Sequence, residues 1–222
     1  MEKRGPKPKG KVHIEWSPDF AYAIGLLVSD GNLSPDGRHI IFTSKDIELI
    51  ILFQKALDIE GSIGRKSSGT MKEKKYFVVQ FSDVLFYTFL LSIGLMPNKS
   101  KVIGEIAIPE EYFFYFLLGS FDGDGCTYSY FDPRWKSSFM FYTVFVSASK
   151  EHVLWIQREV FSRLGIKGHI TGGTKKQCFQ LKYAKADSLL LLRAMYTSID
   201  TPCLMRKRLK IEEMLSTIAE RL

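Results

Sequence analysis

The sequence predicts an α+β fold in which an αββαββα unit occurs twice in tandem, with an antiparallel sheet in each copy and a pseudo-twofold relation between the copies. Three observations predict this fold: a repeated nine-residue stretch, a repeated helix start after a β-like run, and matching pairs of alternating strands. We expect a basic arm at residues 1–17, the first copy at 18–95, a linker at 96–108 and the second copy at 109–222.

The repeated stretch occupies residues 23–31 (AIGLLVSDG) and 117–125 (LLGSFDGDG). A proline and then an acidic residue precede both stretches, at positions 18–19 and 109–110, and both residue types favour the first turn of a helix. Each stretch ends in Asp-Gly, which favours a helix end. Each is therefore predicted to form a short, mostly apolar helix that ends in a carboxylate.

A β-like run and a second helix follow each stretch. The matched helix starts are residues 43–46 (TSKD) and 148–151 (ASKE), in which Ser44 and Ser149 are expected to be the N-caps. Apolar residues then recur at helical spacing in both copies, which predicts that one face of each helix packs in the core.

Hairpins complete the two copies. Residues 59–63 and 166–170 each lead into a basic turn with glycine, and the returning strands are 75–81 and 177–183. Apolar residues alternate along these strands, so one face is expected to pack on helices and the other to meet solvent or a ligand. The second copy carries a longer hairpin around residues 128–138.

Composition narrows the class of protein. The net charge of +7 and the pI of about 9.2 favour a polyanionic partner such as nucleic acid. The three cysteines and four histidines are scattered, which disfavours a disulfide framework and a zinc site. The chain shows neither an apolar run of roughly 20 residues nor a secretory signal. We expect no membrane span and an intracellular protein.

Small residues lie one helical turn apart in each repeated stretch. Gly25 is followed four residues later by Ser29, and Gly119 is followed by Gly123. Residues four apart share one face of a helix, and two helices can approach closely where that face lacks large side chains. We therefore expect Gly25 and Gly119 to lie at a contact between the two repeated helices.

Such a contact brings the terminal carboxylates of the helices, Asp30 and Asp124, close together. Two carboxylates at the negative ends of two helix dipoles repel each other unless a cation neutralises them. Oxygen ligands of this kind suit Mg²⁺, which beside a phosphodiester can activate water and stabilise the charged transition state. The pattern therefore predicts hydrolytic nuclease chemistry.

The two stretches resemble the motif of the LAGLIDADG homing endonucleases, specifically the monomeric type with two motifs in one chain. They match the motif at its glycine, apolar and final Asp-Gly positions, and the order of elements extends the resemblance over nearly the whole chain. The resemblance implies that Asp30 and Asp124 bind the catalytic metals together with the backbone carbonyls of Ser29 and Gly123. It also implies on the order of two or three Mg²⁺ ions at one shared site, for which Ca²⁺ or Mn²⁺ can substitute in a crystal.

Three positions depart from the motif. Val28 stands where the motif has its first aspartate, and Ile24 and Leu118 stand at its alanine position. In the family the position of Val28 belongs to helix packing, and both metal-binding acids are present here. We therefore expect an active enzyme.

The family also places a basic residue from each half near the scissile phosphates. The matching segments are 98–101 and 206–208, from which we assign Lys99 and Lys207, with Lys101 and Arg206 as substitutes. The alternative is that these are ordinary surface lysines at helix starts. Ser44 and Ser149 stand where the family often has a polar side chain that orders active-site water, although N-capping explains them equally well.

The family fold implies that the two sheets form a saddle on double-stranded DNA, with their open faces along the major groove. A single chain would then cut both strands as a monomer, without a protein partner, leaving staggered 3′ overhangs at a long, pseudo-palindromic target. The basic arm is expected to lie against the DNA backbone or in a minor groove, and to be a disordered tail without DNA. Candidate DNA-contacting residues are Arg38, Arg65, Lys66, Tyr76, Gln80, Tyr128, Tyr130, Arg134, Lys136, Gln180 and Lys182.

Other functions are compatible with parts of this pattern. A maturase or a transcription regulator would keep the fold and bind RNA or DNA without cleaving it, although retention of Asp30 and Asp124 argues against this. An endonuclease domain of an intein is disfavoured because the chain ends without a His-Asn pair. A purely structural α+β protein is the remaining alternative. Digestion of a target library with Mg²⁺ distinguishes the maturase or transcription regulator from an endonuclease.

Overall fold

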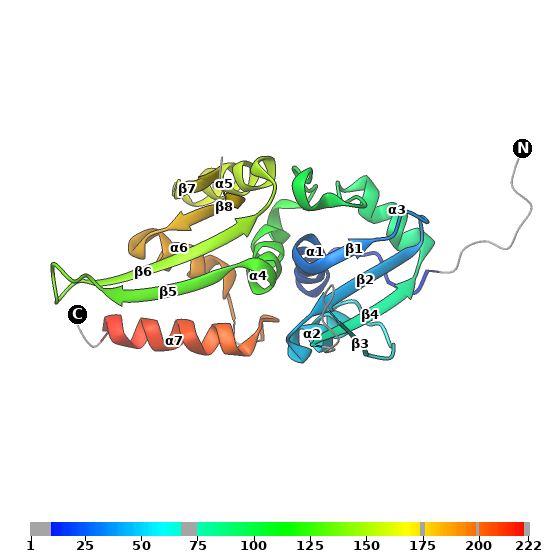
Figure 1. Cartoon of the computed structure of the whole chain (residues 1–222), viewed down its shortest axis with the longest axis horizontal. Helices are drawn as coiled ribbons and strands as arrows, with labels where there is room; N and C mark the ends of the chain where they lie inside the picture. The colour runs from blue at the N-terminus through cyan, green and yellow to red at the C-terminus, as the bar shows by residue number, and fades with distance from the viewer. Residues whose placement is uncertain (1–9, 68–74, 174–175, 199, 220–222) are drawn as a thin grey trace, which may run out of the picture.

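The computed structural model describes residues 10–67, 75–173, 176–198 and 200–219, and its elements fall into two copies of one unit (Figure 1). The first copy consists of α1 (Pro18–Asp30), β1 (Gly31–Leu33), β2 (His39–Ser44), α2 (Ile47–Ala56), β3 (Gly64–Lys66), β4 (Tyr76–Ser82) and α3 (Val84–Ser92). The second consists of α4 (Phe113–Asp124), β5 (Cys126–Phe131), β6 (Phe139–Ser147), α5 (Lys150–Leu164), β7 (His169–Gly173), β8 (Lys176–Tyr183) and α6 (Lys185–Met195). Two short 3₁₀ helices, η1 (Lys99–Lys101) and η2 (Glu110–Tyr112), and the long helix α7 (Met205–Ala219) lie outside this repeat.

The two sheets have the same topology. Their strand orders are β1-β2-β4-β3 and β5-β6-β8-β7, and every pairing is antiparallel. The predicted α+β fold with a tandem repeat of αββαββα units is confirmed. The longer hairpin predicted in the second copy is formed by β5 and β6, which are joined by a turn at residues 132–138.

Helices α1 and α4 lie side by side between the two sheets (Figure 1). Residues 20–28 of α1 are all buried, including Ile24 and Leu27 with no exposed surface. A helix that is apolar on every side needs partners all around it, and α1 has a sheet on one side and α4 on the other. The junction of the two halves is therefore the centre of the hydrophobic core.

The predicted N-cap of α2 is wrong. Asp46 caps α2 and Ser149 caps α5, each by accepting a bond from a backbone N–H in the first turn. Ser44 is instead equivalent to Ser147: in both copies this hydroxyl accepts a bond of 3.1 Å from the backbone N–H of the capping residue. Asp46 is therefore equivalent to Ser149 in the fold, so the match of residues 43–46 with residues 148–151 is shifted by two positions. Short polar segments of similar sequence can lie at different places in a fold.

Helix α7 was not part of the predicted unit. It follows α6 and lies along β5, where Lys210 Nζ donates a bond of 2.6 Å to the carbonyl of Thr127 (Figure 1). Its first turn includes the basic segment 206–208, from which we assign Lys207. The second copy is therefore one helix longer than the repeat, and this helix carries Lys207.

Residues 1–9 of the predicted basic arm lie outside the described residues. The rest of the arm packs on the first copy: Val12 is buried, and the ring of Trp16 contacts the rings of Phe20 and Phe89. No helix in the described part of the chain is long and apolar enough to cross a membrane.

Candidate active site

Two glycines allow α1 and α4 to touch backbone to backbone. A Cβ atom at Gly25 would lie 2.1 Å from the carbonyl oxygen of Phe116, and one at Gly119 would lie 2.0 Å from that of Tyr22. Real Cβ atoms do not approach backbone this closely, so a side chain at either position would push the helices apart. Gly123 lies next in the same row, because its Cβ would overlap Ser29 at 1.9 Å from Oγ.

We expect Gly25→Ala to destabilise the protein because the added methyl group meets rigid backbone rather than the end of a flexible side chain. Overpacking of this kind costs about 1–3 kcal/mol or more. Urea unfolding of the variant measures the loss. Gly61→Ala is the matched control, since its Cβ would meet only side-chain atoms at 3.5 Å or beyond. Equal stability of the two variants would contradict the close contact of α1 and α4.

The close contact brings Asp30 and Asp124, the last residues of α1 and α4, into one site. A Cβ on Gly123, the neighbour of Asp124, would lie 3.3 Å from Asp30 Oδ2. Desolvation and the charge of Asp124 raise the pKa of Asp30 to about 6, although Lys99 and Lys207 act to lower it. Desolvation also raises the pKa of Asp124, again opposed by the two lysines. The site therefore concentrates negative charge from both halves.

Lys99 and Lys207 are buried beside these carboxylates, with 6% and 8% of their surface exposed. Lys99 Nζ donates a bond of 2.5 Å to the carbonyl of Gly31, and Lys207 Nζ donates one of 2.7 Å to that of Gly125. These two glycines occupy the same motif position, so the lysines are equivalent in the two copies. Burial lowers the pKa of both lysines to about 8. Neither is an ordinary surface lysine.

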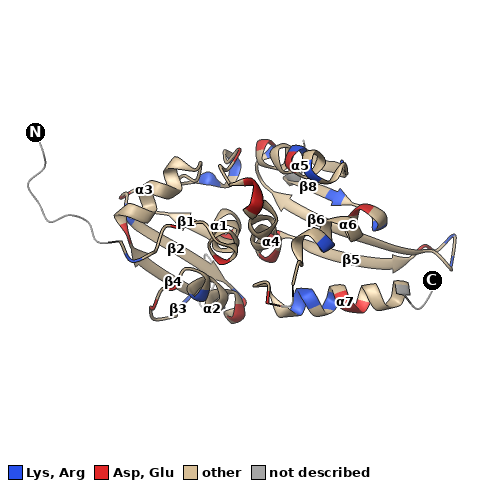
Figure 2. Ribbon diagram, turned by 180° about the vertical axis from the view of Figure 1, so that it is seen from behind, with Lys and Arg blue, Asp and Glu red and all other residues tan. Residues whose placement is uncertain are grey.

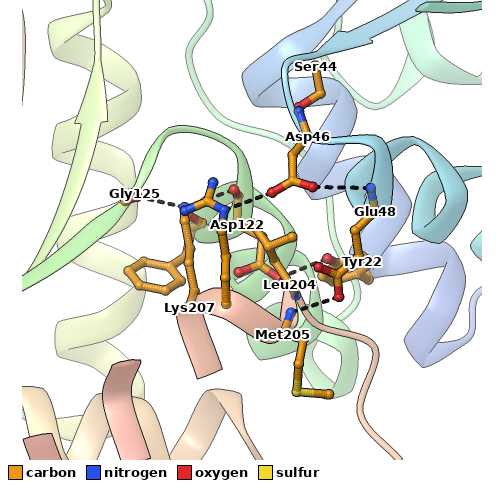
Figure 3. A network of polar contacts seen from close by, with 11 residues as sticks. Tyr22, Ser44, Asp46, Glu48, Asp122, Gly125, Leu204, Met205 and Lys207 are labelled. Atoms are coloured by element: carbon orange, nitrogen blue, oxygen red, sulfur yellow. Dashed lines mark hydrogen bonds and ion pairs between the residues drawn. The ribbon is translucent and has the colours of Figure 1, made fainter. Parts of the chain in front are cut away.

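The alternative basic residues lie elsewhere. Lys101 is exposed, and Arg206 forms an ion pair with Asp46 at 2.7 Å. Lys207 also donates to the carbonyls of Phe121 and Asp122, at 2.5 and 2.8 Å, so three carbonyls hold its ammonium group (Figure 3). Among the four assigned and substitute basic residues, the two assigned lysines are the ones buried against backbone carbonyls.

A cavity of about 250 Å³ opens beside Asp124 and is lined by residues of both halves. Ser29 and Lys99 line it from the first half and the linker, and His152 lines it from α5. The carbonyls in the last turn of a helix have no partner within the helix, so those of Ser29 and Gly123 are available to a bound cation. The junction thus offers oxygen ligands, space and two ammonium groups.

Asp122, which is not among the site residues predicted from the sequence, has no exposed surface. Its Oδ2 accepts bonds from the Tyr22 hydroxyl at 2.8 Å and from the Leu204 backbone N–H at 2.7 Å (Figure 3). It therefore joins α1, α4 and the segment that leads into α7. The available signal was the additional aspartate of the second stretch, where the first stretch has Val28.

Burial raises the pKa of Asp122 to about 6, which predicts a pH-dependent contribution to stability. A carboxyl group with a raised pKa in the folded state stabilises that state below its ordinary pKa of 3.8, and this stabilisation is lost as pH rises towards 6. A shift of this size corresponds to about 3 kcal/mol. Asp122→Asn is expected to remove this loss between pH 4 and 7, as measured by urea unfolding at both pH values. An unchanged pH dependence would contradict it.

Most candidate DNA contacts in the strands share the face of each sheet that is not packed on the core. In the first copy Lys66 pairs with Tyr76, and Gln80 lies on the same side of β4. Arg65 does not join them, because it is in register with Phe77 and stacks on that ring at 4.6 Å, on the face that packs on helices. Neighbouring residues of a strand project to opposite faces of the sheet, so Arg65 and Lys66 lie on different faces.

The open face of the second sheet is more aromatic. The rings of Tyr128, Tyr130 and Tyr142 stack nearly parallel, with centroids 5.1–6.5 Å apart. Gln180 and Lys182 of β8 also project to this open face. Lys182 pairs with Val144, and Val144 pairs with Cys126. Cys126 lies two residues before Tyr128 in β5, so the two project to the same side.

The remaining candidates lie in turns. Arg134 and Lys136 lie in the turn between β5 and β6, where Arg134 binds Asp132 through two nitrogens at 3.2 and 3.0 Å. Arg38 precedes β2 and pairs with Asp36 at 3.7 Å. Arg38 and Arg134 therefore have acidic partners of their own.

Neither a protein-family model nor a curated protein matches the sequence. Solved structures do match its fold. Full-length DUF199/WhiA from Thermatoga maritima is similar with a TM-score of 0.58 and 16% identity, over 96% of this chain and 64% of WhiA. The LAGLIDADG homing endonuclease I-LtrWI, bound to target DNA, matches with a TM-score of 0.59 and 10% identity, over 92% of this chain and 93% of the enzyme.

A third similar structure is I-DmoI in complex with DNA and Mn, with a TM-score of 0.53 and 15% identity, over 82% of this chain and 97% of that one. The chain spans about 64% of the length of full-length WhiA and nearly all of the two endonucleases. These identities establish the fold alone. This chain therefore has the tandem-repeat fold of the LAGLIDADG proteins, which includes homing endonucleases and the domain found in WhiA.

Proposed function

We propose that this protein is a site-specific homing endonuclease that hydrolyses both strands of a long, pseudo-palindromic DNA target and leaves staggered 3′ overhangs. The observation that carries the proposal is the meeting of Asp30 and Asp124, from separate copies of the repeat, with the buried Lys99 and Lys207. An ordinary structural junction between two halves has no need of two carboxylates and two desolvated ammonium groups.

The carboxylates of Asp30 and Asp124 would hold divalent cations, together with the carbonyls of Ser29 and Gly123. The raised pKa values of the two acids fit this role, since a cation relieves the repulsion and desolvation that raise them. All of these ligand atoms are oxygens, which suits Mg²⁺. When bound, Mg²⁺ activates a water molecule and stabilises the charge that develops on the phosphate.

Lys99 and Lys207 would each face one of the two scissile phosphates. Each ammonium group is held by a carbonyl of its own half, at Gly31 or Gly125, so its position is set before DNA binds. A preorganised positive charge in a site with little water stabilises the transition state more than one that must reorient. The equivalence of the two lysines fits cleavage of two strands by one chain.

The open faces of the two sheets would read the DNA. Lys66, Tyr76 and Gln80 in the first sheet, and Gln180 and Lys182 in the second, can contact base edges in a major groove. The similar endonuclease I-LtrWI was solved bound to its target DNA, which supports DNA as the partner. The chain would act as a monomer, because it supplies both halves of the site.

The second candidate function is DNA or RNA binding without cleavage, as in a maturase or a transcription regulator. The observation in its favour is that WhiA, which is not named as an endonuclease, shares the fold. Both functions need the basic charge and the open sheet faces. Only cleavage needs the four charged groups at the junction.

A selection from randomised double-stranded DNA tests the proposal. The protein is incubated with the library in Mg²⁺, and the ends of cut molecules are sequenced. Recovery of one recurring target with offset cuts, abolished by EDTA, is the expected result. Enrichment of a bound sequence that stays intact in Mg²⁺ and Mn²⁺ would favour the second candidate.

A further inference from the structure

Each lysine-bearing segment is held by the opposite half of the molecule. At the start of α7, the backbone N–H of Met205 donates to Glu48 Oε1 at 3.0 Å, and Arg206 Nε donates to Asp46 Oδ2 at 2.7 Å (Figure 3). Asp46 is the N-cap of α2 in the first copy, and Glu48 belongs to the first turn of that helix. The residue that follows Arg206 is Lys207, so these bonds fix the end of the helix that presents it.

The segment after Lys99 is held in the same way by the second copy. Ser149 Oγ donates to the carbonyl of Ile103 at 2.5 Å, and His152 Nδ1 donates to that of Gly104 at 2.7 Å. The backbone N–H of Ile103 in turn donates to the carbonyl of Lys99 at 2.8 Å. Ser149 is the N-cap of α5 and His152 lies in its first turn, and they are 1% and 2% exposed.

These two sets of contacts are equivalent in the fold but different in chemistry. Asp46 and Ser149 are the N-caps of equivalent helices. The Asp46–Arg206 contact is an ion pair at the surface, and the bonds of Ser149 and His152 are buried bonds to carbonyls. Both sets of contacts join one half of the molecule to the other. Each contact holds a residue that lies one to five positions from Lys99 or Lys207 in the sequence.

We propose that Asp46 and His152 are positioning residues. Asp46, in the first copy, orients Lys207, and His152, in the second copy, orients Lys99. This inference rests on the proposed endonuclease function, in which each lysine serves the cleavage of one strand. Loss of Asp46 then slows the strand that depends on Lys207, and loss of His152 slows the strand that depends on Lys99. The two residues therefore control different strands.

Two pairs of variants separate positioning from folding. Asp46→Ser keeps an N-cap residue, as Ser149 does in the other copy, but the side chain is too short to reach Arg206. Asp46→Asn also keeps the cap, through its single oxygen, but its NH₂ group takes the place of the Oδ2 that accepts the bond from Arg206. His152→Leu removes the donor to Gly104, and His152→Asn keeps a donor near the place of Nδ1. Thermal unfolding and DNA-binding affinity are measured for all four variants.

The rates of cleavage are followed under single-turnover conditions on a target duplex labelled differently on each strand. Asp46→Ser is expected to slow one strand about tenfold or more and His152→Leu the opposite strand, since small misplacements of catalytic groups cost factors of this size. Asp46→Asn is expected to slow the same strand as Asp46→Ser, whereas His152→Asn restores the rate, so nicked DNA accumulates with every variant except His152→Asn.

Equal slowing of both strands by either variant, slowing of the same strand by both, or no slowing would overturn the inference. Asp46 lies at the surface, so its variants keep the test valid if His152→Leu does not fold. A wild-type protein that cleaves neither strand would reject the proposed function itself. The cleavage rates of the variants are therefore compared with those of a wild-type protein that cleaves both DNA strands.

Discussion

Replacement of Asp30 or Asp124 by asparagine is expected to abolish double-strand cleavage while the protein still binds its target. The amide keeps the shape of the side chain but removes the charge that would hold a divalent cation at the junction. A bound metal contributes several kcal/mol of transition-state stabilisation, so the rate is expected to fall by at least about 10³-fold. Conversion of a supercoiled plasmid to the linear form measures cleavage, and fluorescence anisotropy measures binding.

The raised pKa of Asp30 implies that Asp30→Asn does not destabilise the fold. Because desolvation and Asp124 disfavour its charged form, the neutral amide is expected to keep or increase the stability of the metal-free protein at pH 7. A loss of cleavage therefore cannot be attributed to unfolding. Asp19→Asn, in the first turn of the same helix, is the matched control and should cleave normally. Unchanged cleavage by both Asp30→Asn and Asp124→Asn would rule out the proposed active site.

Replacement of Lys99 or Lys207 by methionine is expected to slow one strand each. Methionine resembles the lysine side chain in length but carries no charge, so the transition state loses one preorganised cation. Loss of one such group costs about 10²–10³-fold in rate. The double variant is expected to lose cleavage of both strands. Strand-specific labels on a target duplex measure each rate.

The two lysine variants should differ in stability. Lys207→Met leaves the carbonyls of Asp122 and Gly125 without their ammonium donor, and that of Phe121 keeps only the Gly125 N–H, whereas Lys99→Met affects one carbonyl, that of Gly31. Unpaired buried acceptors destabilise the folded state, so Lys207→Met is expected to melt at the lower temperature. Lys101→Met changes an exposed neighbour and controls for general charge effects. Rates within about twofold of wild type in both variants would exclude these lysines from the site.

Short-range spacing was sufficient to predict much of the fold. The small residues at Gly25 and Gly119, the Asp-Gly helix ends and the alternation of residues 75–81 are local patterns with fixed structural periods. They repeat in the same order in both halves. A helix of period 3.6 and a strand of period 2 therefore determine which face of each element is buried, before any tertiary contact is known.

Only the tertiary structure decided which distant residues meet. The burial of Lys99 and Lys207, the bonds of Asp122 to Tyr22 and Leu204, and the place of Arg65 on the helix-packed face depend on segments far apart in the chain. The equivalence of Ser44 with Ser147 likewise required the strand register. Local sequence determines the period of a helix or strand but not the neighbour against which it packs. That neighbour depends on the packing of the whole core.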